Sequence, residues 1–253
     1  MPDKSRRAAQ MALALLAASV PLTAGANTER EPPRGGIASV LKKEIARRKT
    51  LAFDDILRSW EYNFGTKAVP PLLRIAADKT NDDPDRYLAV MGAAKLGGMT
   101  VAPKLVKLLE DPSWMIRTAA LRALTALNHP ETAEHVLPLL RDPSLIVRTE
   151  AVEAISRLRP PGAKDALLSA LEDSANYHQG KAQWVPARAL QALVKMGAKD
   201  TAPKLRPLLF RTRDPELQKQ TVQALESLTG RKLAPGAPLA ARIDQWKAEL
   251  ARK

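Results

Sequence analysis

Side chains able to carry out chemistry are few in this sequence, and they are spread along its length. There is no cysteine, which excludes thiolate nucleophiles, cysteine zinc sites and disulfides together. The three histidines are His129, His135 and His178, and no two of them have the spacing of paired ligands on one helical turn. We therefore expect no bound metal and no cofactor.

Three pairs of adjacent carboxylates remain, and each falls near the end of an expected helix or in a turn. They are Asp54-Asp55, Asp82-Asp83 and Glu172-Asp173. Capping and solvation explain acidic residues at such places without general acid–base chemistry. Neither a nucleophile elbow nor a phosphate-binding glycine loop occurs, and Gly97-Gly98 is typical of a helix C-cap. No residue is singled out as catalytic, so we expect that the protein is not an enzyme.

The elements that would position any site are helices, because two stretches repeat each other at a period of 31 residues. Asp111–Leu127 and Asp142–Leu158 both begin with Asp-Pro-Ser and carry an Arg six residues after the Asp. Asp111 and Asp142 are N-cap candidates, since the first turn of a helix accepts the proline that follows them. Similarity at a fixed period is typical of stacked helical arrays.

Apolar residues follow these starts at helical spacing and predict the buried face of each helix. They are Ile116, Ala120, Ala123, Leu124 and Leu127 in one copy and Val147, Ala151, Ala154, Ile155 and Leu158 in the next. The preceding segments, Thr100–Glu110 and Glu131–Arg141, share a leucine pattern at the same shift. Each unit is therefore expected to be a helix, a short turn and a second helix.

Further copies extend the array to about five helix pairs over residues 67–230. Asn81–Leu96 is an earlier copy, with Arg86 at the Arg position. Val185–Met196 follows its counterpart by 38 residues, because the preceding loop is longer, and Asp214–Leu228 returns to a period of 32. The chain has 45% apolar but only 4% aromatic residues, which suits an Ala/Leu-rich helical array.

The repeated unit resembles the HEAT repeat family, in which an Asp-Pro turn leads into a second helix that begins with a Val-Arg pair. The resemblance implies an all-α, right-handed α-solenoid in which the Asp and the Arg form a ladder between neighbouring repeats. Those roles fall on Asp111, Arg117, Asp142 and Arg148. The fourth copy has Pro186 at the Arg position and the fifth has Gln220 near it, so the ladder is not expected there.

Segments on both sides of the array are expected to cap its open ends. Residues 37–66 predict two helices, and residues 231–253 predict a Pro/Gly linker and a final helix with Trp246 on its apolar stripe. The aromatic residues of the first cap fit a core, with a ligand-binding cluster as the alternative. They are Trp60, Tyr62 and Phe64.

Residues 1–26 predict a cleaved secretory signal, with a basic start, the apolar run Met11–Val20 and small residues up to Ala26. The run is too short for a permanent transmembrane helix, and an amphipathic helix is the alternative. Residues 27–36 are polar and rich in proline and glycine, which predicts a disordered leader. Export without cysteine is typical of a bacterial periplasm. We expect a periplasmic or envelope-associated protein, exported by either the Sec or the twin-arginine route.

The chain is strongly basic, with a formal net charge of +13 at pH 7. Loss of the predicted signal would leave 37 basic and 26 acidic residues, a net charge of +11. A basic solenoid can bind a polyanion, and an exported protein meets lipid head groups, cell-wall polymers or acidic proteins rather than nucleic acid. On the expected concave face the basic candidates are Lys95, Arg122, Arg157 and Lys195.

The lengthened loop Ser174–Trp184 is the other candidate binding site. Insertions in solenoids project from one edge and often touch the partner. This one carries residue types that are enriched at interface hot spots, namely Tyr177, His178, Lys181 and Trp184. Packing of Trp184 at the start of the next helix is the structural alternative.

These features predict a non-catalytic scaffold or adaptor that binds a protein partner through the concave face and residues 174–184. A basic polyanion or membrane-surface binder is the first alternative. An enzyme-maturation factor or lyase-like HEAT protein is the second, because some cyanobacterial bilin lyases contain similar repeats.

Overall fold

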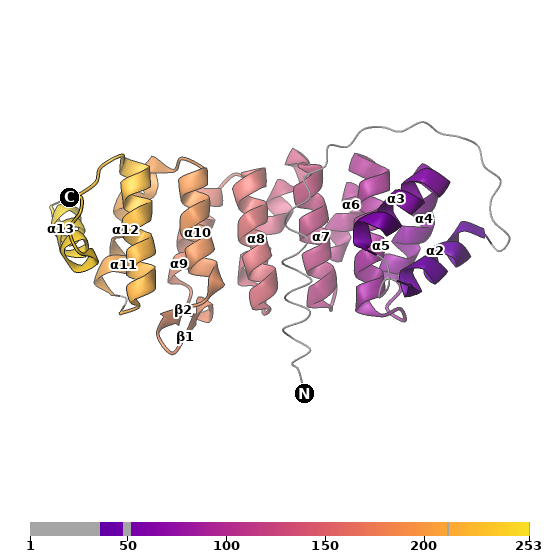
Figure 1. The fold of residues 1–253 in the computed structure, drawn as a ribbon, viewed down its shortest axis with the longest axis horizontal. Coiled ribbons are helices and arrows are strands. Elements are labelled where there is room, and N and C mark those ends of the chain that lie inside the picture. The colour runs from indigo at the N-terminus through magenta and orange to yellow at the C-terminus, as the bar shows by residue number, and fades with distance from the viewer. Residues whose placement is uncertain (1–35, 48–51, 212, 253) are drawn as a thin grey trace. The chain divides into compact units, whose positions relative to one another are not determined.

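The computed structural model of the protein describes residues 36–47, 52–211 and 213–252. The predicted signal and all but the last residue of the predicted leader lie outside these described residues. The described part belongs to one compact unit, in which helices follow each other as stacked pairs (Figure 1).

Within the described residues, five helix pairs form the array. The first helices of the pairs are α4 (Val69–Ala77), α6 (Ala102–Leu108), the 3-10 helix η4 (Pro130–Arg141), α9 (Ala163–Glu172), and η6 (Lys199–Leu205) continued by α11 (Arg206–Phe210). The second helices are α5 (Asp83–Gly97), α7 (Trp114–Leu127), α8 (Leu145–Leu158), α10 (Trp184–Lys195) and α12 (Pro215–Thr229). The second helices pack side by side in chain order, in front of the first helices in the view of Figure 1.

Proline shapes the first helices. Pro138 lies inside η4 and Pro203 inside η6, where the missing N–H prevents a continuous α-helix. Both segments are accordingly 3-10 helices, in which the backbone hydrogen bonds join residues three apart instead of four apart. The segment Glu131–Arg141, expected as a helix from its leucine pattern, therefore has a tighter backbone than its counterpart α6, which follows the short 3-10 helix η3 (Gly98–Val101).

The second helices α7 and α8 begin after the Asp-Pro-Ser motif rather than at its Asp. The N-cap of α7 is Ser113, whose hydroxyl accepts a backbone N–H at 3.2 Å, and the N-cap position of α8 is Ser144. The expectation that Asp111 and Asp142 are N-caps is therefore wrong. Their carboxylates accept the backbone N–H of these serines, at 2.9 and 2.8 Å, and so close a turn that precedes the helix.

Alanine lets the second helices pack closely. Ala89, Ala120, Ala151 and Ala189 occupy equivalent positions on four successive second helices, and all are fully buried. The buried apolar side chains form one continuous core that runs from α2 to α13. The expected all-α solenoid of stacked helix pairs is confirmed.

The N-terminal cap is built around Trp60. Its elements are α2 (Gly36–Ala46), α3 (Phe53–Phe64) and the short 3-10 helix η2 (Gly65–Ala68). Trp60 is fully buried and its indole N–H donates to the Glu44 carboxylate at 2.6 Å. Gly92 of α5 faces the ring so closely that a Cβ there would lie 2.5 Å from it. Phe64 packs partly against the core, but Tyr62 is 69% exposed, so the core interpretation does not hold for that residue.

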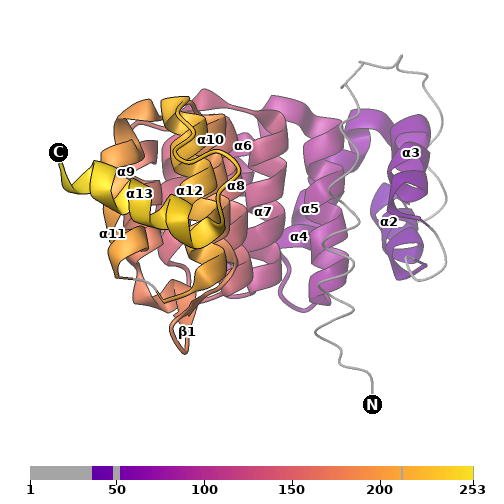
Figure 2. The same ribbon diagram turned by 60° about the vertical axis from the view of Figure 1, so that its left-hand side comes forward.

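The C-terminal cap is α13 (Leu239–Ala251), which packs on α12 and α11 (Figure 2). Its buried stripe consists of Ile243, Trp246 and Leu250. Arg242 donates to the Glu226 carboxylate of α12 at 2.7 Å and so fixes the first turn of α13. Trp246 folds back onto the array as expected from its spacing.

The lengthened loop folds into a small hairpin, which begins with the 3-10 turn η5 (Ser174–Asn176). Strands β1 (Tyr177–His178) and β2 (Lys181–Ala182) pair antiparallel around Gln179 and Gly180. Both turn residues have positive φ, +50° and +76°, as a two-residue hairpin turn requires. The sequence predicts no strand here, because strands of two residues are too short to show alternation.

None of the described helices combines the length and hydropathy needed to cross a membrane.

Candidate protein-interaction site

The regular part of the array is joined by paired Arg and Asp side chains, which we call the ladder. Arg86 of α5 makes a bidentate pair with Asp111, with one N–O distance of 3.3 Å, and both side chains are nearly fully buried. Arg117 of α7 pairs in the same way with Asp142, at 2.7 and 2.8 Å. Each pair links one second helix to the turn of the following repeat.

Each ladder Arg also binds backbone. The Arg117 guanidinium donates to the carbonyl oxygens of Asp111 and Pro112, at 2.8 and 3.0 Å. The partner carboxylates meanwhile accept serine N–H groups. Most donors and acceptors of the buried pair are therefore satisfied, which is the condition under which a buried ion pair is tolerated.

At the next junction, which follows α8, residues of the hairpin accept the hydrogen bonds of the ladder Arg in place of an Asp. Arg148 of α8 donates to the side-chain oxygen of Asn176 and to the carbonyl oxygen of Ala175, both at 2.8 Å. Asp173, which lies 31 residues after Asp142, accepts the N–H of Ala175 at 2.9 Å. The family role of Arg148, a link to the following repeat, is kept here, but a neutral amide and a carbonyl stand in for the carboxylate.

The hairpin also replaces the missing Arg one junction later. The fourth second helix has Pro186 where the three preceding ones have Arg, and Pro186 has no side-chain donor. Asp214 instead accepts the backbone N–H of Ala182, in β2, at 2.8 Å. Its other oxygen accepts the N–H groups of Glu216 and Leu217 and caps α12. Gln220, which lies near the Arg position in sequence, donates to Glu216 and takes no part in this junction.

Of the four hairpin candidates, Tyr177 is anchored. Its ring packs partly against the core and its hydroxyl donates to the Leu171 carbonyl at 2.5 Å. Burial, with a smaller effect of the negative charges of Asp214 and Glu172, raises the pKa of Tyr177 to about 12. His178 and Lys181 are exposed on the two strands. Tyr177 therefore has a structural role, whereas His178 and Lys181 remain exposed.

Trp184 is 55% exposed even though it is the first residue of a regular helix. The equivalent residues of the two preceding second helices are Met115 and Ile146, which are only partly buried and do not pack against the core. We call Met115, Ile146 and Trp184 the apolar strip. Met115 and Ile146 are absent from the sequence prediction, although their spacing of 31 residues could have placed them in line.

Two of the predicted basic residues are held by ion pairs on the second-helix face. Arg122 of α7 donates to Glu150 of α8 at 2.8 Å and to the Tyr87 hydroxyl of α5 at 3.1 Å. Lys195 of α10 lies 3.6 Å from Glu153 of α8. Burial raises the pKa of Tyr87, so its phenol stays neutral beside the charged Arg122. These contacts tie four neighbouring helices together, α5, α7, α8 and α10.

Three of the predicted basic residues share a place in their helices. Lys95, Arg157 and Lys195 all lie in the last turn, where the negative end of the helix dipole favours a cation. The row of basic side chains expected across the stack therefore has a structural explanation. Among the described residues, Lys95 and Arg157 have no ion-pair partner, and neither has Arg188, four residues after Trp184 on the same face of α10.

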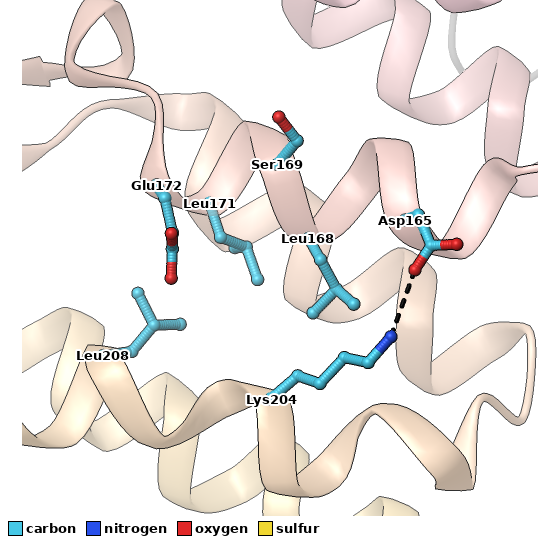
Figure 3. Close-up of a pocket in the computed structure, with 7 residues that line it drawn as sticks. All are labelled: Asp165, Leu168, Ser169, Leu171, Glu172, Lys204 and Leu208. Atoms are coloured by element: carbon cyan, nitrogen blue, oxygen red, sulfur yellow. Dashed lines mark hydrogen bonds and ion pairs between the residues drawn. The ribbon is translucent and has the colours of Figure 1, made fainter.

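A groove of about 360 Å³ lies on the other side of the stack, between α9 and the η6–α11 segment (Figure 3). Leu168, Leu171 and Leu208 form its apolar walls. Lys204 reaches across one end to Asp165 at 3.2 Å, and both of these side chains are more than half exposed. The volume is at the lower limit of small-molecule pockets.

The histidines lie apart. His129 is the N-cap of η4, and its Nδ1 accepts the N–H of Glu131 at 3.2 Å. His135 is exposed on η4 and His178 on β1. In the described part of the chain, no three His, Asp or Glu side chains are grouped as metal ligands would be.

Comparison with known proteins supports the repeat assignment. A family model for HEAT repeats matches residues 69–155 and, overlapping, residues 102–183. These stretches run from α4 through the hairpin. No curated protein matches the chain in sequence.

Similar solved structures are repeat proteins of related folds. A designed armadillo repeat protein in complex with the peptide (KR)4 has a TM-score of 0.50 at 22% identity, over 79% of this chain and 95% of that chain. The YibA protein of E. coli has a TM-score of 0.43 at 17% identity, over 90% and 100%. The complex of CpcE and CpcF of phycocyanin lyase from Nostoc has a TM-score of 0.31 at 17% identity, over 92% and 100%.

At these identities the likeness concerns the fold alone. The family match, the 31-residue period and the Arg–Asp ladder agree on the kind of repeat. Over residues 69–183, therefore, this chain is built of HEAT repeats.

Proposed function

We propose that the protein is a non-catalytic scaffold that binds a protein partner through the exposed face of its second helices and through the hairpin. Folds of the HEAT and armadillo type generally mediate protein binding, because stacked repeats present one extended, rigid surface. The charged side chains of this face are engaged mainly in links between helices, a structural use that needs no substrate.

The observation that carries the proposal is the exposure of Trp184. A tryptophan held outward by the first turn of an ordered helix costs free energy in water and loses little entropy when a partner covers it. Of the other three tryptophans, Trp60 and Trp246 are buried and Trp114 packs partly against the core. Among the tryptophans, exposure is therefore specific to the place where the hairpin joins the stack.

A pull-down tests the scaffold. The full chain is immobilised and exposed to an envelope extract at low and high salt, in parallel with Trp184→Ala and with the control Phe210→Ala, which removes an aromatic ring that is 45% exposed on α11. We expect one discrete protein that survives high salt, binds the control and is lost with Trp184→Ala. Equal retention by all three baits, or retention of no protein, would contradict the proposal.

We also propose that the protein acts in the envelope of a bacterium, because its N-terminal sequence has the features of an export signal. N-terminal sequencing of the chain recovered from the periplasm should give Asn27 as the first residue. Recovery of the chain from the cytoplasm with Met1 or Pro2 still in place would contradict export.

A second candidate function, binding of an anionic envelope polymer, is favoured by the cations without ion-pair partners among the described residues: Lys95, Arg157 and Arg188. Affinity for such a polymer falls steeply with ionic strength, whereas a largely apolar protein interface is much less sensitive. If high salt releases everything that the immobilised chain retains, this second function replaces the first.

A further inference from the structure

We infer that the apolar strip, together with Lys181 and Arg188, binds an extended acidic segment of the partner that carries apolar side chains between its carboxylates. This inference rests on the proposed scaffold function and specifies the chemistry of its partner. It follows from the placement of three apolar and two basic side chains at the hairpin end of α7, α8 and α10.

The strip supplies the apolar part of the site. Met115, Ile146 and Trp184 stand in the first turns of three helices that pack side by side, so they form a row across the stack. Packed helix axes are about 8–10 Å apart, which makes the row roughly 16–20 Å long. An extended chain advances about 3.3 Å per residue, so about six residues would cover it.

Two uncompensated cations flank the exposed end of the row. Lys181 lies on β2, three residues before Trp184, and Arg188 lies one helical turn after it on the same face of α10. Both are exposed, and neither has an ion-pair partner among the described residues. Arg is favoured at hot spots because its planar guanidinium can bind a carboxylate with two hydrogen bonds.

The carboxylates around the strip are already engaged. Glu150 and Glu153 of α8 pair with Arg122 and Lys195. At the far end, Glu216 of α12 lies near Lys219 and accepts from Gln220. On the hairpin side, Asp214 is buried and accepts three backbone N–H groups.

The exposed carboxylate of Glu172 lies on the hairpin side as well, at the end of α9, where its charge acts on Tyr177. Its side chain lines the groove between α9 and the η6–α11 segment rather than the row (Figure 3). With the other carboxylates engaged, the free charge beside Trp184 is positive and comes from Lys181 and Arg188. An acidic segment is therefore favoured over a basic or neutral one.

The test is selection of random 12-residue peptides displayed on phage, with the immobilised full chain as bait. We expect the selected peptides to combine Asp or Glu with aromatic or aliphatic residues within a stretch of about six. Synthetic copies should bind Trp184→Ala and Arg188→Glu at least about 10-fold more weakly than the unmodified chain, as is typical for anchor residues.

Two variants on the first-helix side serve as matched controls. Phe210→Ala removes an exposed aromatic ring from α11, and Arg74→Glu reverses an exposed charge on α4. Both should leave peptide affinity within about 2-fold, because neither residue belongs to the strip or flanks it. Circular dichroism of all four variants establishes that each is folded.

The outcomes separate this inference from the scaffold proposal. Selected peptides that are basic, or whose affinity is unchanged in Trp184→Ala and Arg188→Glu, would overturn the inference while the pull-down result stands. If no peptide is selected and polyphosphate binds the unmodified chain and Trp184→Ala equally, the cations serve a polyanion and the inference is overturned. Absence of any discrete protein from the pull-down with the unmodified chain would overturn the scaffold proposal.

Discussion

The junctions between repeats are made in two chemically different ways. Between α5, α7 and the turn before α8, the links are buried Arg–Asp pairs, each with two charged partners. Between α8, α10 and α12, the hairpin provides the links, through the Asn176 amide, the Ala175 carbonyl and the Ala182 N–H. The same packing is thus obtained from side-chain charge in one half and mostly from backbone in the other.

The difference shows what the insertion is for. Where the Arg is absent, at Pro186, an ordinary short turn would leave Asp214 without a partner from the preceding repeat. The hairpin supplies that partner and at the same time places Trp184 and Lys181 at the surface. One inserted segment therefore both links neighbouring repeats and exposes Trp184 and Lys181.

The largest effect is expected in the charged half. Asp142→Ala removes the two bonds that the largely buried Arg117 makes to Asp142, and the acceptor of the Ser144 N–H. A buried cation without its partner should lower the free energy of unfolding by about 3–5 kcal/mol. Urea unfolding followed by circular dichroism measures this loss. Asp165→Ala is the control, because its ion pair with Lys204 is exposed and should be worth about 1 kcal/mol or less.

A smaller effect is expected in the hairpin half. Asn176→Ala removes the bond from Arg148 and the bond to the Ala170 carbonyl, but Arg148 keeps the carbonyl oxygens of Ala175 and Asp142. The free energy of unfolding should fall by about 1–3 kcal/mol in the same urea experiment. A loss equal to that of Asp142→Ala would mean that the amide is as important as the carboxylate, and the contrast between the two halves would fail.

Alkaline pH should test the hairpin half through Tyr177. Its pKa in the folded state is raised from 10 to about 12, so folding favours the protonated phenol. This contribution to stability is complete below pH 10 and is lost as the pH rises toward 12. Tyr177→Phe should therefore lose less stability than the unmodified chain between pH 9 and 12, measured as urea midpoints. Parallel curves for the two proteins would show that the Tyr177 hydroxyl is not held as described.

The smallest effect on stability is expected for Trp184→Ala. Because the side chain is more than half exposed, its removal should change the free energy of unfolding by about 1 kcal/mol or less. Thermal unfolding by circular dichroism tests this. A loss comparable to that of Asn176→Ala would make Trp184 a packing residue of the hairpin junction rather than a surface residue.

The repeat architecture could be predicted because it depends on periodicity. Ala120 and Ala151 show the period, and their burial follows from helical spacing alone. The ladder role of Asp111 follows from the family resemblance but not from its own sequence neighbourhood, which favours an N-cap, because the choice between the two depends on Arg86 in the preceding repeat. That competition is decided by tertiary packing.

The candidate site was predicted in part. The position of the insertion identified Trp184 and Lys181, but spacing cannot tell an exposed tryptophan from a buried one such as Trp60, which is covered by another helix. It also could not show that Tyr177 is anchored by the Leu171 carbonyl. Arg122 looked available in sequence, yet Glu150 and Tyr87 approach it only once the helices are stacked.

The backbone links of the hairpin have a consequence for how this surface can change over evolutionary time. Ala175 holds the stack through its carbonyl oxygen, which every residue has, and Ala182 through its N–H, which every residue except proline has. Nothing lies within 4 Å of the position that a Cβ would take at Gly180. The tip can thus accept a grafted loop, or change among residues such as glycine and asparagine that tolerate the positive φ of Gln179 and Gly180, without uncoupling the repeats. A lineage of such proteins could acquire new partners at this turn while the ladder on the other side stays under constraint.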